Sequence, residues 1–312
     1  MIVQEVDNHN INVEVSAVPS KDSKDETAVL TDGEENGNKD TSAVAWLRAY
    51  ITSPNDGGLE LFICVVLGCI CLGIGYSIEE PQERPIPVQV INTTQDETLY
   101  IRDGQYNQVF EGDTVPDLYV YLMILVTPLV QLACCVVNQR FYSSQHNVRD
   151  WHKTICVYIL TLATNDLATW ALKAYAGYLR PSFYQICQPN ASYDTCLSGE
   201  DYYRDSFPSG HASFSFCTMV LLYKYLERTF GYTSILQPLA SSRPKYPIVL
   251  YRVSSTLSMA LPLGLASFVS VSRVVDNRHH PADIVAGAIL GSFLAHFFFS
   301  LFFTAHTQAQ QQ

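Results

Sequence analysis

The sequence predicts an all-α, polytopic membrane protein with six transmembrane helices. Three observations lead to this fold class: the hydrophobic residues, 48% of the chain, occur in blocks; the acidic residues concentrate in one tail and one connection; and the basic residues gather in alternate connections. A bilayer-spanning helix needs roughly 17 to 25 mostly apolar residues. Six segments reach or approach this length: 59–78, 119–138, 152–171, 212–226 (the shortest), 248–271 and 284–303.

The chain before the first block has the composition of a disordered tail. Residues 1–45 hold ten acidic residues, three lysines and no aromatic residue, so they lack the apolar surface that would offset the entropy of ordering. The tail does not have a basic start followed by an apolar stretch, so no cleaved signal peptide is predicted. We therefore expect a disordered acidic cytoplasmic tail at 1–48, a six-span domain at 49–304 and a short cytoplasmic tail at 305–312.

The charge of the chain belongs to this tail and to the first connection. Residues 79–118 hold nine acidic residues and two arginines; with the tail they contribute −14 to a net charge of −11, so the remainder carries about +3. The acidity is therefore local, and no nucleic-acid partner is expected.

The basic residues predict the orientation of the spans, because cytoplasmic connections are enriched in Lys and Arg. The second connection holds Arg140, Arg149 and Lys153, and the fourth holds Lys224, Arg228, Arg243, Lys245 and Arg252. The first connection holds only Arg84 and Arg102. Both termini should then be cytoplasmic, and the first, third and fifth connections should face the lumen or the outside.

Two further features agree with this orientation. Asn92 and Asn190 begin the permitted Asn-x-Ser/Thr sequons, and both fall on the predicted outer side, where glycans are attached. Seven of nine cysteines lie in apolar blocks, whereas Cys187 and Cys196 lie in an outer connection. An oxidising compartment permits a disulfide between these two, and a pair of free thiols stays the alternative.

The first of three polar clusters on the outer side is "KAYAGYLRP", residues 173–181. If the third helix continues outward, Lys173 and Arg180 share one face, and Asp166 lies seven residues earlier on the same stripe. The alternative is a basic helix end whose side chains reach toward the membrane surface.

The second cluster, "FPSGHAS", places Ser209, Gly210 and His211 just before an apolar block. A Ser-Gly turn that leads into a helix N-terminus presents a hydroxyl and backbone N–H groups, which suit an anion. For an isolated Ser-Gly-His the simpler reading is a helix cap beside a surface histidine.

The third cluster, "SRVVDNRHHPADIVAG", begins at residue 272. Pro281 suits a first helical turn, and His279 and Asp283 are then four residues apart, close enough for the carboxylate to accept one imidazole proton and fix the tautomer. Arg273 adds a fixed cation. On a helix His280 should point about 100° away from His279, so we treat it as a secondary candidate for the reaction.

Together the clusters predict phosphoryl transfer. The charge on phosphate would be held by Lys173, Arg180, Ser209, the Gly210 N–H and Arg273. His279, oriented by Asp283, would attack phosphorus, and His211 would protonate the leaving alkoxide as general acid.

In order and spacing, Lys173-x6-Arg180-Pro181, Pro208-Ser209-Gly210-His211 and Ser272-Arg273-x5-His279-x3-Asp283 resemble the three-part signature of the type 2 phosphatidate phosphatase superfamily. Six spans, with the first two motifs in one outer connection, are similar to lipid phosphate phosphatases. The resemblance implies a helical phosphatase core and the same roles for the residues above.

The resemblance also implies a Mg-independent hydrolase with no cofactor and no metal site. Its substrates would be phosphatidate, lysophosphatidate, sphingosine 1-phosphate or ceramide 1-phosphate, and the reaction would pass through a phosphohistidine to yield diacylglycerol, or the corresponding lipid, and phosphate. The plasma membrane would be the expected location. The preferred lipid and self-association into homo-oligomers stay open.

Two alternatives remain at this stage. A polyprenyl or diacylglycerol diphosphate phosphatase uses the same kind of site to cleave a lipid pyrophosphate. A non-catalytic, lipid-phosphatase-related membrane protein would share the spans but would not need all three clusters intact.

Overall fold

The computed structural model describes residues 57–78, 81–92, 98–142, 146–198, 202–230 and 248–309. The predicted tail at 1–48 and most of the fourth connection lie outside these residues. All described residues belong to one compact unit.

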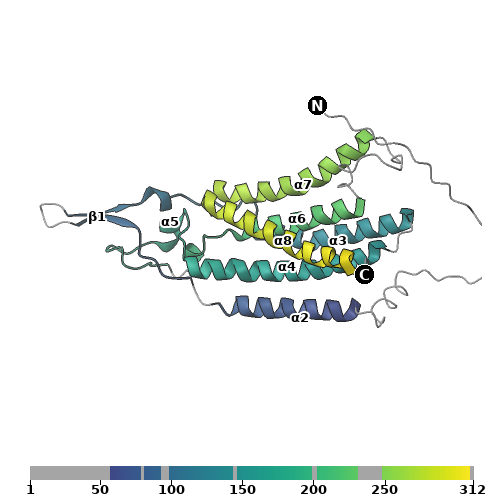
Figure 1. Ribbon diagram of the computed structural model, residues 1–312. Coiled ribbons are helices and arrows are strands. Elements are labelled where there is room, and N and C mark those ends of the chain that lie inside the picture. Colours follow the sequence, from purple (N-terminus) through teal and green to yellow (C-terminus); the bar gives the residue numbers. More distant parts are fainter. Residues whose placement is uncertain are drawn as a thin grey trace, which may run out of the picture. The chain divides into compact units, whose positions relative to one another are not determined.

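Six long helices form a bundle in which α6 is central (Figure 1). They are α2 (Gly57–Tyr76), α3 (Asp117–Tyr142), α4 (His146–Ala176), α6 (Gly210–Phe230), α7 (Ile248–Val275) and α8 (Pro281–Ala309). Helix α6 packs against α3, α4, α7 and α8, while α2 packs against α4 at the side of the bundle. The predicted all-α membrane class is confirmed.

Five of these helices are long and apolar enough to cross a membrane: α2, α3, α4, α7 and α8. The sixth predicted span coincides with α6, which is 21 residues long but does not meet the same measure of composition. Its small polar residues, such as Ser213, Ser215 and Thr218, are fully buried against neighbouring helices. A helix that faces protein on most sides does not need a lipid-like surface, which explains why this segment gave the weakest signal. The count of six spans stays a prediction.

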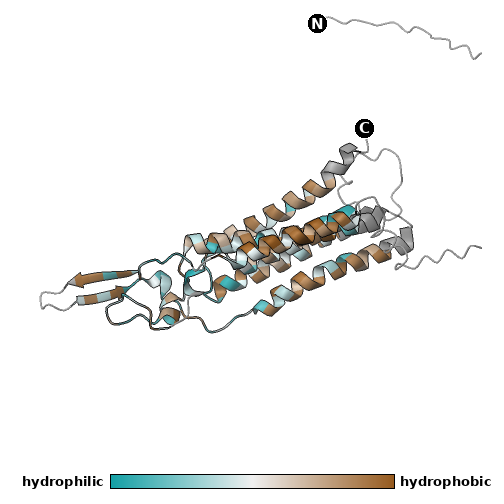
Figure 2. Ribbon diagram, turned by 90° about the horizontal axis from the view of Figure 1, so that it is seen from below, coloured by the Kyte–Doolittle hydropathy of each residue, from teal (hydrophilic) through white to brown (hydrophobic). Residues whose placement is uncertain are grey.

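The outer surfaces of the bundle are apolar, as a bilayer requires. Figure 2 shows hydrophobic residues along most of the helix surfaces and hydrophilic residues gathered in the loops at one end. Phe62 of α2 and Leu125 of α3, for example, are 64% and 61% exposed. The chain is thus an integral membrane protein, and the loops that the structure describes lie at one end of the helices.

That end carries small elements that the sequence did not predict. Strands β1 (Val88–Asn92) and β2 (Thr98–Arg102) form an antiparallel hairpin, followed by the turn η1 (Gly104–Tyr106). The short helices α5 (Phe183–Cys187) and η2 (Tyr202–Arg204) lie in the connection between α4 and α6. Apolar side chains beneath the hairpin, including Ile86, Phe183 and Tyr203, form a separate small core.

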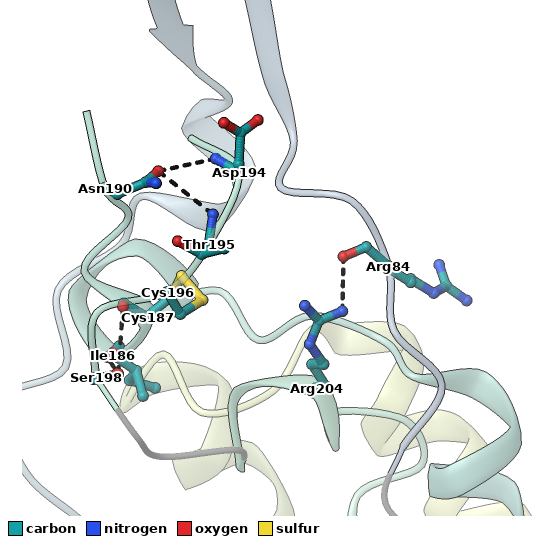
Figure 3. The surroundings of a disulfide bond; sticks show 9 residues. All are labelled: Arg84, Ile186, Cys187, Asn190, Asp194, Thr195, Cys196, Ser198 and Arg204. Carbon is teal, nitrogen blue, oxygen red and sulfur yellow. Dashed lines mark hydrogen bonds between the residues drawn. A yellow bond between two sulfur atoms is a disulfide. The ribbon is translucent and has the colours of Figure 1, made fainter. Parts of the chain in front are cut away.

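A disulfide between Cys187 and Cys196 closes a loop beside this core (Figure 3). Leu197 and Ser198 donate backbone hydrogen bonds to the Cys187 carbonyl, so the loop folds back onto α5. At the other side of the view, Arg204 donates a hydrogen bond to the carbonyl oxygen of Arg84 at 2.7 Å, which ties the connection between α2 and α3 to the connection between α4 and α6.

Two glycines of α8 allow α6 to approach closely. A Cβ atom at Gly287 would lie 2.5 Å from the Ser209 carbonyl oxygen, and one at Gly291 would lie 2.0 Å from that of Ser213. This Gly-x-x-x-Gly spacing is typical of tightly packed membrane helices, which associate through close backbone contact. Ala295, one turn further along α8, is also fully buried and continues the small-residue face.

We expect Gly291→Ala to push α8 away from α6 and destabilise the protein. Overpacking typically costs about 1–3 kcal/mol, and here the added methyl meets a backbone atom that cannot rotate away. Thermal unfolding of the purified protein in detergent measures the effect. Gly264→Ala in α7 is the matched control, because a Cβ there meets nothing within 4 Å. Equal melting temperatures for the two variants would contradict the close-contact account.

Candidate active site

The first motif lies where α4 ends. Lys173 is in the last turn, and the N–H of Gly177 donates to the Lys173 carbonyl at 2.9 Å, which closes the helix. Gly177 has φ +51°, and a Cβ there would lie 2.1 Å from the Gln82 carbonyl oxygen. Glycine is therefore required both by the backbone conformation and by the close contact. The expectation that the helix continues to Arg180 is therefore wrong: Arg180 lies on the turn beyond α4.

Lys173 and Arg180 nevertheless converge, because both bind Asp205. Arg180 donates through Nε and Nη2 to Asp205 Oδ1 at 2.9 and 2.7 Å. Lys173 Nζ donates to the Asp205 carbonyl oxygen and lies 3.5 Å from Oδ2. Both cations are buried. A shared carboxylate thus replaces the shared helix face that the spacing suggested.

Asp205 was not predicted, because it belongs to no motif. Burial alone would raise the pKa of this carboxyl, but the charges and hydrogen bonds of Arg180 and Lys173 hold it below its ordinary value. Asp205 is therefore ionised at neutral pH and offsets two buried positive charges.

The second motif starts α6 as predicted, with Gly210 as the first helical residue. Ser209 is fully buried; its Oγ accepts from the Ala212 N–H at 3.4 Å and its N–H donates to the Asp283 carbonyl at 3.1 Å. His211 Nε2 lies 3.3 Å from Asp117 Oδ1, at the start of α3. The structure thus gives Ser209 a capping role and places a carboxylate beside His211.

In the third motif, His279 is buried between the two preceding clusters. Its Nδ1 lies 2.7 Å from the Ser206 carbonyl oxygen, which can only accept, so Nδ1 carries the proton and Nε2 keeps its lone pair. Burial, with the positive charges of Arg180 and Lys173, holds the pKa of His279 well below its ordinary value. The ring is therefore neutral, as a nucleophile requires.

Asp283 acts on His279 less directly than expected. Its Oδ2 lies 3.6 Å from His279 Nδ1, beyond hydrogen-bond distance, and instead accepts from Ser206 Oγ at 2.6 Å and from the His280 N–H at 2.9 Å. Asp283 holds Ser206, and the Ser206 carbonyl fixes the tautomer. His280 does point away, as predicted: its Nε2 lies 3.0 Å from the Leu179 carbonyl.

Arg273 is buried and held by carboxylates that the sequence did not single out. Its Nη1 donates to Asp113 Oδ1 at 2.8 Å, and its Nη2 donates to Asp276 Oδ2 at 2.6 Å. Arg278 donates to both oxygens of the same Asp113 at 3.0 and 2.9 Å. Burial alone would raise the pKa of Asp113, but Arg278 and Arg273 hold it below its ordinary value.

One cavity of about 960 Å³ joins the three clusters. Its polar end is lined by six of the predicted residues, namely Lys173, Arg180, Gly210, His211, Arg273 and His279. Ser209 and Asp283 do not line it and support it from behind. Asp113, Asp117, Asp205 and Arg278 also line the cavity. Most of the remaining wall is apolar and comes from α2, α3 and α4, with residues such as Leu72, Ile124 and Leu162. The cavity therefore runs from a cationic site at the helix ends into the membrane-spanning region.

Comparison with known proteins agrees with this site. Residues 154–307, which contain all three motifs, match the PAP2 superfamily. This match confirms the resemblance inferred from the motifs.

Among its relatives are three phosphatases. Lipid phosphate phosphatase 2 of Arabidopsis thaliana is 30% identical over 62% of this chain and 63% of that protein. Lipid phosphate phosphatase 1 of the same plant is 28% identical over 62% of this chain and 56% of that protein, so the matches span about three fifths of these relatives. Phospholipid phosphatase 1 of Rattus norvegicus is 25% identical over 74% of this chain and 82% of that protein. No solved structure matches the chain.

We expect Asp205→Asn to be strongly destabilised, by about 3–5 kcal/mol, because it leaves two buried cations without their shared charge partner. Chemical or thermal unfolding in detergent measures the change. Asp194→Asn, an identical substitution at an exposed position of the disulfide loop, should stay within about 0.5 kcal/mol of the parent protein. Similar stability of the two variants would contradict the role of Asp205 as a charge partner.

Proposed function

We propose that this protein is a lipid phosphate phosphatase, a hydrolase that removes phosphate from lipid monoesters. The observation that carries the proposal is the two-part cavity: cations and two histidines at one end, and an apolar wall within the membrane at the other. A lipid phosphate has the same division into a charged group and a hydrocarbon chain. The names of the plant and rat relatives support this reading.

The proposed mechanism has two steps, the formation of a phosphohistidine and its hydrolysis. The His279 Nε2 lone pair attacks phosphorus while the bond from phosphorus to the lipid oxygen breaks, and that oxygen takes a proton from His211. Water, deprotonated by His211, then attacks the phosphohistidine and releases phosphate. Lys173, Arg180, Arg273 and the Gly210 N–H stabilise the charge on the phosphoryl oxygens in both steps. Burial and the positive charge of Arg273 lower the pKa of His211 to about 4, and the carboxylate of Asp117, 3.3 Å from Nε2, opposes this shift.

We propose the wider substrate range and metal independence on the same grounds. Phosphatidate, lysophosphatidate, sphingosine 1-phosphate and ceramide 1-phosphate share the phosphate monoester, and the mechanism assigns no step to Mg²⁺. A phosphate-release assay over these lipids and a lipid diphosphate, with a chelator present, tests both points. Activity confined to the diphosphate would replace the proposal with the pyrophosphatase alternative.

Replacing each of the two site histidines should affect phosphatase activity in a different way. His279→Ala removes the nucleophile, so no phosphoenzyme forms with any ester. His211→Ala removes the acid, which typically contributes about 10²- to 10⁴-fold, and the loss should be large for a lipid alkoxide but small for p-nitrophenolate, a stable anion. Phosphate release from a lipid phosphate and from p-nitrophenyl phosphate measures the difference.

His280→Ala is the matched control for His279→Ala, because its ring contacts Leu179 and lies outside the cavity lining. We expect a mild loss on both esters. Phosphoenzyme that persists in His279→Ala and disappears in His280→Ala would show that the nucleophile is the other histidine.

We also propose that the site faces the lumen or the extracellular side, with both termini cytoplasmic and the plasma membrane as its location. The disulfide and Asn190 lie in the same connection as Arg180 and Asp205. Asn190 Oδ1 accepts from the Asp194 and Thr195 N–H groups, and its Nδ2 is the atom that would carry a glycan (Figure 3).

A glycosidase-sensitive mobility shift in a eukaryotic host tests this orientation. Ser192→Ala destroys the sequon without removing the Asn190 side chain, so part of the shift should disappear; Thr94→Ala should remove the part due to Asn92. Ser198→Ala, outside both sequons, is the control. Glycans absent from both sites, together with protease access to residues 139–151 from outside, would overturn the orientation.

A further inference from the structure

A carboxylate of the protein binds one of the cations that are proposed to hold phosphate. Asp113 lines the cavity, and its Oδ1 accepts a hydrogen bond from Arg273 Nη1 at 2.8 Å. Carboxylate and phosphoryl oxygens are both acceptors that match the fork of N–H groups on a guanidinium. Asp113 and a phosphate ester therefore compete for Arg273.

The hydrogen bonds of Arg273 show why this competition matters. A guanidinium has five N–H groups. The Nε of Arg273 donates to Ser272 Oγ at 3.2 Å, and Nη2 donates to Ser272 Oγ at 3.1 Å and to Asp276 Oδ2 at 2.6 Å. Together with the bond from Nη1 to Asp113, acceptors within the protein take four of the five N–H groups. Both N–H groups of Nη1 can reach a phosphoryl group only if Asp113 gives up its bond, while Ser272 and Asp276 keep the guanidinium in place.

Arg278 is placed to hold Asp113 when that bond is given up. Its Nε and Nη2 donate to the two Asp113 oxygens at 3.0 and 2.9 Å, which is a bidentate pair. The guanidinium of Arg278 also lies 3.7 Å from the centre of the Phe110 ring, which supports its position. The Asp113 side chain is 27% exposed, so it has room to turn from Arg273 toward Arg278.

We propose that Asp113 and Arg278 are positioning residues that set the affinity of the site for phosphate. This inference rests on the proposed function. When a phosphoryl group arrives, Arg273 Nη1 donates to it, and Asp113 stays with Arg278 alone. Asp113 thus weakens phosphate binding, and Arg278 limits this effect because it draws the carboxylate away from Arg273. A site balanced in this way binds the product phosphate weakly and releases it after each reaction.

Calorimetric binding of inorganic phosphate to the purified full chain in detergent tests the proposal. Asp113→Asn should tighten the Kd about tenfold, because Arg273 gains a hydrogen bond to a charged group, and such bonds are the stronger kind. Arg278→Gln should weaken the Kd about tenfold, because Asp113 then binds Arg273 alone. Arg102→Gln is the matched control and should leave the Kd unchanged. Arg102 also donates a hydrogen bond, to Tyr193, and lies over the ring of Tyr184, but it does not line the cavity.

The double variant decides whether Arg278 acts through Asp113. If Arg278 attracted phosphate only by its charge, Arg278→Gln would weaken binding by one factor in the parent protein and in the Asp113→Asn background. If it acts through Asp113, its effect in the Asp113→Asn background should fall to about twofold or less, since the two residues are coupled. Arg278→Lys keeps the charge but loses the bidentate pair with Asp113, so it should weaken phosphate binding as well. This last variant tests the proposal even if Asp113→Asn does not fold.

The outcomes separate this inference from the proposed function. An unchanged or weaker Kd in Asp113→Asn, equal effects of Arg278→Gln in both backgrounds, or an Arg278→Lys variant that binds like the parent protein would each disprove the inference and leave the phosphatase. If the parent protein binds phosphate too weakly to measure, Asp113→Asn should bring the Kd into range, and its failure to bind would disprove the inference too. Calorimetry needs no turnover. A parent protein that binds phosphate as expected but releases none from any ester, including p-nitrophenyl phosphate, would therefore contradict the proposed function itself.

Discussion

The close approach of α6 and α8 is the constraint on which the site depends. Gly287 of α8 lies against the Ser209 carbonyl, and Ser209 in turn donates its N–H to the Asp283 carbonyl. The second motif is thereby fixed against the third at the level of the backbone, before any catalytic side chain is considered. A larger residue at either glycine would separate the start of α6, which carries His211, from the turn that carries His279. The small residues of α8 thus contribute to the geometry of the site as well as to packing in the membrane.

A second constraint is the balance of charge around the polar end of the cavity. Lys173 and Arg180 share Asp205, while Arg273 and Arg278 share Asp113. Buried cations would be prohibitively costly without such partners, and the same contacts limit the directions in which the guanidinium groups point. A phosphoryl group that binds here meets donors that are already oriented, so less reorganisation accompanies its arrival. The carboxylates therefore serve the cations in two ways: they offset charge and they fix position.

How far the sequence predicts this structure depends on whether a feature is local. The membrane class, the start of α6 at Gly210 and the start of α8 at Pro281 follow from apolar blocks and helix-start residues, which are local signals. The partners Asp205, Asp113 and Ser206 come from connections with no motif, and only the fold brings them to the cations and to His279. The helical spacing rule gives the wrong position for Arg180, because it assumes a continuous helix, whereas α4 ends at Ala176 and Gly177 begins the turn. The hairpin of β1 and β2 was missed for a related reason, since its acidic connection gave no clear alternation of apolar and polar residues.

The position of Lys173 connects the chemistry with the membrane. Because α4 ends at Ala176, Lys173 lies within the last turn of a spanning helix, and its side chain extends to Asp205 beyond the helix end. The same helix supplies Ile159, Leu162 and Ala163 to the apolar part of the cavity. A single rigid element thus sets the distance between the cationic site and the hydrocarbon region. A phosphate ester held by Lys173 would keep its chain in the membrane during the reaction, so hydrolysis would not require the whole lipid to leave the bilayer.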